Sequence, residues 1–295
     1  MSDPTAWLLE PLHYRFVCRG LGMAVLLGVS GGIAGSVLLL RRMALMADSF
    51  GHSLLPGVAL SYLVLGPGIA SLFAGAAIAG LFTTLISGVA HRLTRLKEDA
   101  AFGSFFILCF ALGAALMSRL AAPVDLLHYL FGNILAVTSA DLILVAVTAS
   151  LTVLLATVFY RTLVIETFDP SFHRACGGWS SLTNLSILTV TVLDLVSALQ
   201  AVGMVLAIGM FILPAATAYL WCERIDRMLL CASLYGAVVS ALGLYLSYHL
   251  NLPSGPCMVT ALGTGFVASV LVSPNGVIGR HLRSRAPSGP RRSLA

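Results

Sequence analysis

Long apolar runs recur along the chain and are separated by short polar stretches. A helix needs about 20 predominantly apolar residues to cross the ~30 Å hydrocarbon core of a bilayer. The pattern predicts an all-α polytopic membrane protein with nine transmembrane helices, and with eight as the alternative count. The predicted crossings lie at about residues 17–40, 44–65, 69–90, 101–120, 141–160, 181–200, 202–220, 228–249 and 257–272.

A further apolar piece, "LLHYLFGNILAV" (126–137), is too short to cross, so we expect a re-entrant or interfacial segment there. Glycines cluster inside two of the runs, in "GVSGGIAGS" (28–36) and "GAAIAG" (75–80). Small residues let helix backbones approach closely in a membrane, where lipid provides no hydrophobic drive for association. These glycines therefore predict close helix packing.

The arginines indicate the orientation, because short cytoplasmic loops collect Lys and Arg. With nine crossings, residues 41–42, 91–99, 161–174 and 223–227 and the C-terminal tail all fall on one side. The N-terminal stretch, with Arg15 and Arg19, falls on the other side and fits this rule least well. We expect the N-terminus outside and the C-terminus in the cytoplasm.

No linker divides the chain, so we expect one transmembrane domain over 1–280 and a basic cytoplasmic tail over 281–295.

The composition supports this class. The chain is 58% hydrophobic and 10% charged, whereas soluble domains carry about 25% charged residues. The net charge is +5, and the basic C-terminal tail contributes to it. Such a tail suits the anionic lipids of a cytoplasmic membrane surface. We therefore expect membrane lipids as neighbours and no nucleic-acid partner.

Two ionisable residues, Asp48 and His52, lie four positions apart inside the second apolar run. Ionisable residues inside a membrane are functional candidates by default. Residues i and i+4 share one helix face, with Cβ atoms about 5–6 Å apart. A carboxylate and an imidazole at this spacing could hold one divalent cation, and they suit Mn, Fe or Zn better than Cu(I). A purely structural ion pair and a proton relay are the alternatives.

Pro56 and Gly57 follow this pair and predict a local helix break, because proline provides no N–H to the carbonyl of His52. Such breaks are tolerated at membrane depth where they line a cavity. Asp194 is the other carboxylate well inside a predicted span, and no histidine shares its face. We interpret Asp194 as an interhelical hydrogen-bonding residue, with a ligand role as the alternative.

Two motif absences in the sequence bear on function. The chain has a single lysine, Lys97, and no Gly-Lys-Ser/Thr sequence that could cradle a nucleotide phosphate. If ATP drives this protein, a partner must bind it. No HExxH motif occurs, so the helix typical of zinc proteases is missing. We expect a protein that is not an enzyme itself.

The stretch "LLLRRMALMADSFGHSLLPGVAL" (38–60) resembles the signature of the membrane permeases of manganese/zinc/iron-type ABC importers, the ABC-3 family. Four further blocks, in family order, extend the resemblance over about 240 residues. They are "HYLFGNILAVTSADL" (128–142), "ETFDPSFHRACG" (166–177), "LQAVGMVLAIGMFILPAATA" (199–218) and "LPSGPCMVTALGTGF" (252–266).

The resemblance implies a role for two sets of residues. Asp48 and His52 match the family's transmembrane metal ligands. The second set matches the cytoplasmic segment that docks onto the ATPase, although Cys176 stands where an aliphatic residue is usual. This ATPase-coupling segment contains Phe168, Asp169, Pro170, Phe172, Cys176 and Gly177.

The resemblance further implies a homodimer that works with two ATP-binding cassette subunits and an extracytoplasmic metal-binding protein in a bacterial cytoplasmic (inner) membrane. No cofactor would be bound permanently, and the transported cation would be Mn, Fe or Zn. Pro56 belongs to the form associated with manganese and iron importers, so manganese is favoured. A stand-alone secondary cation transporter and a cobalamin/siderophore-type ABC permease are the alternatives.

Overall fold

The computed structural model describes residues 10–66, 68–96, 98–118, 134–274 and 276, and every regular element in these ranges is a helix. The prediction of an all-α protein is confirmed. The elements are η1 (Glu10–His13), α2 (Arg15–Leu40), α3 (Ala44–Ser53), α4 (Leu55–Leu65), α5 (Ile69–Leu93), α6 (Glu98–Met117), η2 (Ile134–Ala136), α8 (Ser139–Val158), α9 (Tyr160–Phe168), α10 (Pro170–Ala175), α11 (Ser180–Val202), α12 (Met204–Trp221), α13 (Ile225–Leu250) and α14 (Ser254–Val272).

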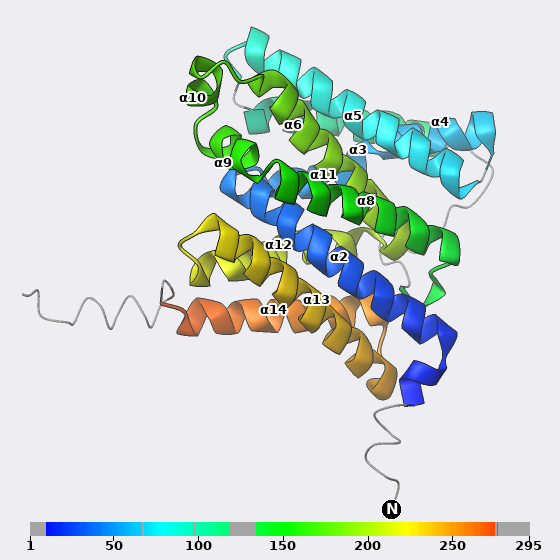
Figure 1. The fold of residues 1–295 in the computed structure, drawn as a ribbon. Coiled ribbons are helices and arrows are strands. Elements are labelled where there is room, and N and C mark those ends of the chain that lie inside the picture. The colour runs from blue at the N-terminus through cyan, green and yellow to red at the C-terminus, as the bar shows by residue number, and fades with distance from the viewer. Residues whose placement is uncertain (1–9, 67, 97, 119–133, 275, 277–295) are drawn as a thin grey trace, which may run out of the picture.

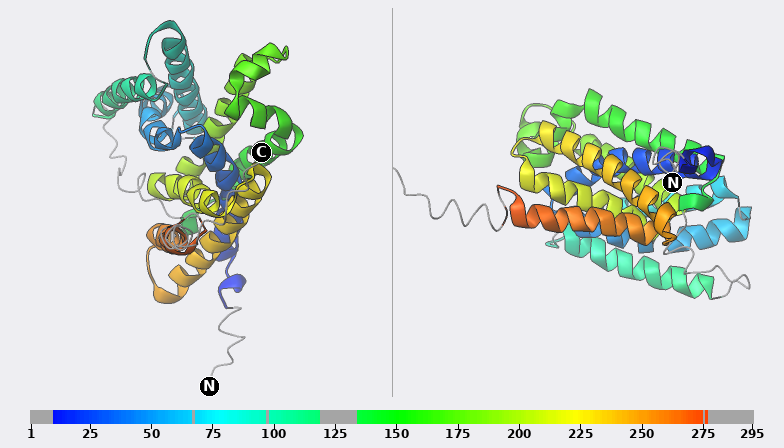
Figure 2. Two further views of the ribbon diagram at one scale, coloured as in Figure 1. Left: turned by 90° about the vertical axis from the view of Figure 1, so that its left-hand side faces the viewer. Right: turned by 90° about the horizontal axis from the view of Figure 1, so that it is seen from below.

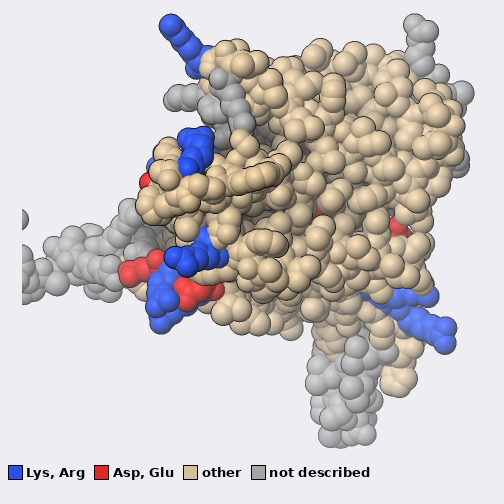
Figure 3. All heavy atoms as spheres, turned by 45° about the horizontal axis from the view of Figure 1, so that its top comes forward, with Lys and Arg blue, Asp and Glu red and all other residues tan. Residues whose placement is uncertain are grey.

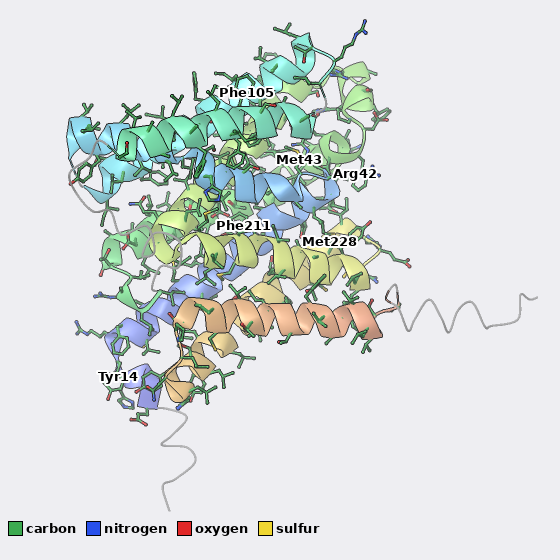
Figure 4. All side chains as sticks on the ribbon, turned by 180° about the vertical axis from the view of Figure 1, so that it is seen from behind. Tyr14, Arg42, Met43, Phe105, Phe211 and Met228 are labelled. Carbon is green, nitrogen blue, oxygen red and sulfur yellow. The ribbon has the colours of Figure 1, made fainter. Side chains whose placement is uncertain are left out.

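Helix α2 runs through the middle of the molecule and packs against α8, α12 and α13 (Figure 1). Helices α3 to α6 pack on one another to one side, and α12 to α14 pack together on the other side (Figure 2). Helix α11 contacts both groups and joins them. Phe211 of α12 is fully buried and lies near the centre (Figure 4).

The burial pattern is that of a membrane protein, because apolar side chains face outward while hydroxyls are buried. On α13 the exposed residues recur every fourth position, and the opposite face buries Ser233, Ser240 and Ser247. On the face that Figure 3 shows, charged side chains gather mainly toward two ends of the molecule, and the surface between them is largely uncharged. The exposed apolar stripe of α13 consists of Leu230, Leu234, Val238, Leu242, Leu246 and Leu250.

Seven of the described helices are long and apolar enough to cross a membrane. They are α2, α5, α8, α11, α12, α13 and α14. The second and fourth predicted crossings correspond to shorter apolar stretches, Ser49–Leu65 and Ala100–Leu116. The predicted span at 44–65 is thus two helices, α3 and α4, with Pro56 in the first turn of α4.

The count of eight or nine crossings and the sides of the two termini stay predictions. Helix α2 begins at the end of the molecule opposite to the end where α14 finishes (Figure 1). Most of the predicted re-entrant piece, 126–133, lies outside the described residues. The predicted basic tail, 281–295, also lies outside them.

The predicted close packing of the glycine clusters is confirmed where α2 crosses α13. A Cβ atom on Gly28 would lie 2.4 Å from the backbone nitrogen of Ala237. A Cβ atom on Gly236 would lie 2.5 Å from the carbonyl oxygen of Gly28. Backbone atoms on both sides set this distance, so no rotamer change could make room for a side chain.

We expect Gly28→Ala to lower the melting temperature of the purified chain, because the added methyl group pushes α2 away from α13. Overpacking of this kind typically costs about 1–3 kcal/mol. Gly88→Ala is the matched control, since nothing lies within 4 Å of its added Cβ. Alanine is the better helix former at both positions by about 0.8–1.0 kcal/mol. An equal effect of the two variants on thermal unfolding would contradict this packing argument.

Candidate functional site

The helix break between α3 and α4 lies directly after His52. Helix α3 ends at Ser53 and α4 begins at Leu55. Pro56 has no N–H to continue the α3 hydrogen-bond pattern, whereas its fixed φ suits a helical first turn. Gly57 packs against α5, where an added Cβ would lie 2.1 Å from the carbonyl oxygen of Gly75. The break is thus held in place by a tight contact between α4 and α5.

The imidazole of His52 is half-buried and lies against α6. Its ring centroid is 5.8 Å from that of Phe106 and 5.2 Å from that of Phe110, the latter nearly edge-to-face at 80°. Other positions of α3, such as Ala47 and Phe50, are fully buried in the core. His52 therefore packs against α6, as does Phe50, whose ring centroid lies 4.6 Å from that of Phe102. In Figure 4, Met43 marks the start of α3 and Phe105 lies on α6.

Asp48 lies in α3 four residues before His52, so the helical register places both on one face. The side chain of Asp48 lies outside the described part of the chain. Among the described side chains, no three His, Cys, Asp or Glu residues come together. The Asp48–His52 pair would supply two ligands, while transition metals in proteins usually take four or more. A cation held here needs further donors from water, backbone or a second copy.

The ATPase-coupling segment predicted from sequence forms the end of α9, the short helix α10 and the turn that follows. Asp169 caps α10, because its carboxylate oxygen Oδ1 accepts the backbone N–H of Phe172 at 2.9 Å. Pro170 begins α10, and Gly177 ends the turn with φ of +78°. The side chains of Phe168 and Phe172 are 61% and 55% exposed, and Cys176 is exposed too. The segment therefore exposes two aromatic side chains next to and on a short helix whose first turn is capped by Asp169.

A group of three largely buried side chains fixes this segment, and sequence reasoning missed it. The carboxylate of Glu166, only 2% exposed, lies 2.6 Å from Nδ1 of His173. Its other oxygen accepts the hydroxyl of Ser180 at 2.8 Å. We call Glu166, His173 and Ser180 the brace, since they join α9, α10 and α11. The sequence feature that could have indicated the brace is Glu166, an acidic residue within the otherwise largely apolar stretch "LVIETF" (163–168).

A cleft of about 480 Å³ opens beside the brace. Its lining includes Glu166 and Ser180 of the brace and Met43, which precedes α3. Arg41 also lines the cleft and donates a hydrogen bond from Nη2 to Oδ1 of Asn184. The cleft thus lies between the coupling segment and the start of the helix that carries Asp48 and His52.

Asp194 is fully buried in α11, and its nearest polar neighbours are the hydroxyls of Ser30, Thr148 and Thr152. Neither carboxylate oxygen has a partner that meets hydrogen-bond geometry. Hydroxyls from α2 and α8 thus surround Asp194, and the interhelical hydrogen-bonding role expected for it stays a prediction.

Comparison with known proteins places the chain among membrane transport proteins. A family model described as the ABC 3 transport family matches residues 13–273. The manganese transport system membrane protein MntC of Listeria innocua is 39% identical over 263 residues, 89% of this chain and 92% of the relative. A probable iron transport system membrane protein of Haemophilus influenzae is 32% identical over 267 residues, 90% of this chain and 97% of the relative.

A solved structure, PsaBC from Streptococcus pneumoniae in complex with Fab, has a similar fold. The TM-score is 0.81 at 32% sequence identity, and the match covers 95% of this chain and 99% of that chain. The helical arrangement of Figure 1 is therefore shared with this structure over nearly the whole length of both chains.

Proposed function

Because the chain belongs to the ABC 3 transport family, we propose that it is the permease subunit of an ATP-driven importer for a divalent transition-metal cation. The observation that carries the proposal is the Asp48–His52 pair on one face of α3, beside the break at Pro56. Relatives whose names refer to manganese or iron transport support the same cargo. The stand-alone transporter and the cobalamin/siderophore-type permease receive no support from these relatives.

We propose that Asp48 and His52 bind the cation as it crosses the membrane. The two residues provide one carboxylate and one imidazole, a donor set that suits Mn, Fe and Zn. In a homodimer, two such pairs would supply four protein ligands, and their negative charge would favour a cation over an anion. Manganese is favoured over iron or zinc because Pro56 follows the pair and because relatives from several organisms are named for manganese.

The coupling segment is proposed to receive the motion of an ATP-binding partner. Its exposed Phe168 and Phe172 offer the kind of aromatic anchors that dominate protein interfaces. The brace ties α10 to α9 and α11 through buried side-chain contacts. A displacement of α10 by the partner would therefore move α11 as well. Helix α11 in turn contacts α3, the helix that carries Asp48 and His52.

The assembly proposed here contains two copies of this chain, two ATP-binding cassette subunits and an extracytoplasmic metal-binding protein. Residues 1–280 form its permease domain in a bacterial cytoplasmic membrane, with the N-terminus outside and the C-terminus inside. The permease is not the catalyst, because its sequence has no nucleotide-binding loop and ATP hydrolysis falls to the partner. Uptake of radioactive manganese into proteoliposomes with and without ATP and the partner tests this proposal. Uptake that needs no ATPase would overturn it in favour of a stand-alone transporter.

We expect Glu166→Ala to uncouple ATP hydrolysis from transport. Loss of the buried carboxylate leaves His173 and Ser180 without their partner, which costs about 1–3 kcal/mol and loosens α10. The number of ATP molecules hydrolysed per manganese ion imported should rise severalfold in proteoliposomes. Glu166→Gln should restore much of the coupling, since an amide can still accept from Ser180.

Asp226→Ala is the matched control, since Asp226 pairs with Arg224 in an exposed ion pair. Exposed pairs contribute little, so we expect this variant to keep the coupling ratio of the unmodified protein. An unchanged ratio in Glu166→Ala would contradict the role of the brace.

A further inference from the structure

The thioether of Met204, the first residue of α12, lies against α3 at Gly51. The side chain of Met204 is buried, with 4% exposed surface. A Cβ atom on Gly51 would lie 3.1 Å from Cε, 3.3 Å from Cγ and 3.4 Å from Sδ of Met204. The sulfur thus contacts α3 at a residue that has no side chain of its own.

Gly51 belongs to the face of α3 that carries the proposed ligand pair. Asp48, Gly51 and His52 all lie in the helix Ala44–Ser53, and the second and third follow the first by three and four residues. Residues at these spacings are neighbours on a helix surface, with Cβ atoms about 5–6 Å apart. Met204 lies where a side chain of Gly51 would lie, so its sulfur borders the face that carries the pair.

The backbone and the surrounding core hold Met204 in this place. Gly203, between α11 and α12, has φ of +85°, a conformation that glycine adopts far more readily than other residues. Helix α12 therefore starts with Met204 directly after this turn. Its side chain belongs to the same buried cluster as Ala47 and Phe50 of α3. The thioether is thus kept against α3.

A thioether at this position would change which cations the pair prefers. Methionine sulfur is a soft ligand, and soft ligands suit transition metals, whereas carboxylates and other oxygen ligands suit Mg²⁺ and Ca²⁺. Ca²⁺ and Mg²⁺ are bound in proteins by oxygen ligands. A sulfur donor beside Asp48 and His52 would therefore disfavour both alkaline-earth ions. Methionine also fills irregular gaps in a core, so a test has to separate the sulfur from the shape.

We propose that Met204 is a specificity-determining residue of the metal site, whose Sδ donates to the cation held by Asp48 and His52 and discriminates against Ca²⁺ and Mg²⁺. This inference rests on the proposed function, because it needs Asp48 and His52 to bind the cargo. The contact with Gly51 is the observation that carries it. The thioether would be a third protein donor in each copy, where transition metals usually take four or more ligands.

Met204→Leu separates the sulfur from the packing, because leucine keeps the volume and the apolar character of methionine. The measurement is ATP-driven uptake of radioactive manganese by the assembled complex in proteoliposomes, in competition with Ca²⁺ and, separately, with the soft ion Cd²⁺. The Ca²⁺ concentration that halves uptake should fall about tenfold in the variant, and the corresponding Cd²⁺ concentration should rise about tenfold. Met210→Leu is the matched control, since Met210 is fully buried further along α12, where its backbone contacts Gly31 of α2. It should keep both concentrations of the unmodified complex.

X-ray absorption at the cadmium edge gives a readout that does not depend on transport. The purified complex loaded with Cd²⁺ should show a sulfur neighbour of the cadmium ion, and so should the Met210→Leu complex. The Met204→Leu complex should lack this neighbour. Should Met204→Leu not fold, a complex produced with selenomethionine, which needs no substitution, should show selenium in place of that sulfur.

Two outcomes separate this inference from the proposed function. The inference alone is wrong if Met204→Leu keeps the Ca²⁺ and Cd²⁺ competition and the sulfur neighbour of the unmodified complex, while Asp48→Ala and His52→Ala abolish uptake. Normal uptake by Asp48→Ala and His52→Ala would instead overturn the proposed site, and the role of Met204 with it.

Discussion

Asp48→Ala and His52→Ala are each expected to abolish manganese uptake while the permease still assembles with its ATPase. Each substitution removes one member of the proposed ligand pair. Even partners that only orient a metal ligand typically contribute 10–100-fold to affinity. Loss of a ligand itself should therefore lower uptake by more than about 100-fold. The measurement is ATP-driven uptake of radioactive manganese into proteoliposomes.

Ser53→Ala is the control for this experiment. Ser53 follows His52 directly, but its hydroxyl is buried and donates to the carbonyl of Phe50 at 3.0 Å. This variant should retain most of the uptake. Asp48→Asn, which keeps the size of the side chain, should be as inactive as the alanine variant. Normal uptake by Asp48→Ala or His52→Ala, at matched amounts of assembled complex, would eliminate the proposed ligand pair.

Phe172→Asp is expected to detach the ATPase from the permease. Phe172 is 55% exposed on α10, where an aromatic side chain can fill a pocket of a partner. An aspartate would bring a charge into that pocket and lose the apolar contact. The amount of ATPase that copurifies with the permease should fall at least tenfold, and uptake should fall with it. Phe168→Asp should act in the same direction.

Phe16→Asp provides the comparison at the other end of the molecule. Phe16 is 42% exposed in the first turn of α2, so the same substitution is made in a comparable aromatic side chain. It should leave copurification of the ATPase unchanged. Full retention of the ATPase by Phe172→Asp would show that the partner docks elsewhere.

The helices could be predicted from the sequence because their signals are local, whereas the coupling segment was inferred from the family resemblance. Runs of apolar residues mark the spans, and Pro56 marks the place near which α3 gives way to α4. Asp169 and Pro170 mark the start of α10 for the same reason, since a capping side chain acts on the next few residues.

The brace and the surroundings of Asp194 could not be predicted, because they depend on contacts between distant parts of the chain. Glu166 meets Ser180 only after α10 has folded back. Ser30 and Thr148 lie more than 40 residues from Asp194 and reach it only when α2 and α8 pack against α11. The contact of His52 with Phe110 likewise depends on the position of α6. Periodicity identifies the faces of helices but not their partners.

The most direct test of the account locates the cargo in the assembled importer. A crystal of the complex loaded with manganese should give an anomalous diffraction peak at the manganese edge within bonding distance of the Asp48 carboxylate and the His52 imidazole. The peak should be absent from crystals of the His52→Ala complex loaded in the same way. A peak in the membrane region away from both residues, or an equal peak in the variant, would contradict the central claim that this pair holds the transported ion.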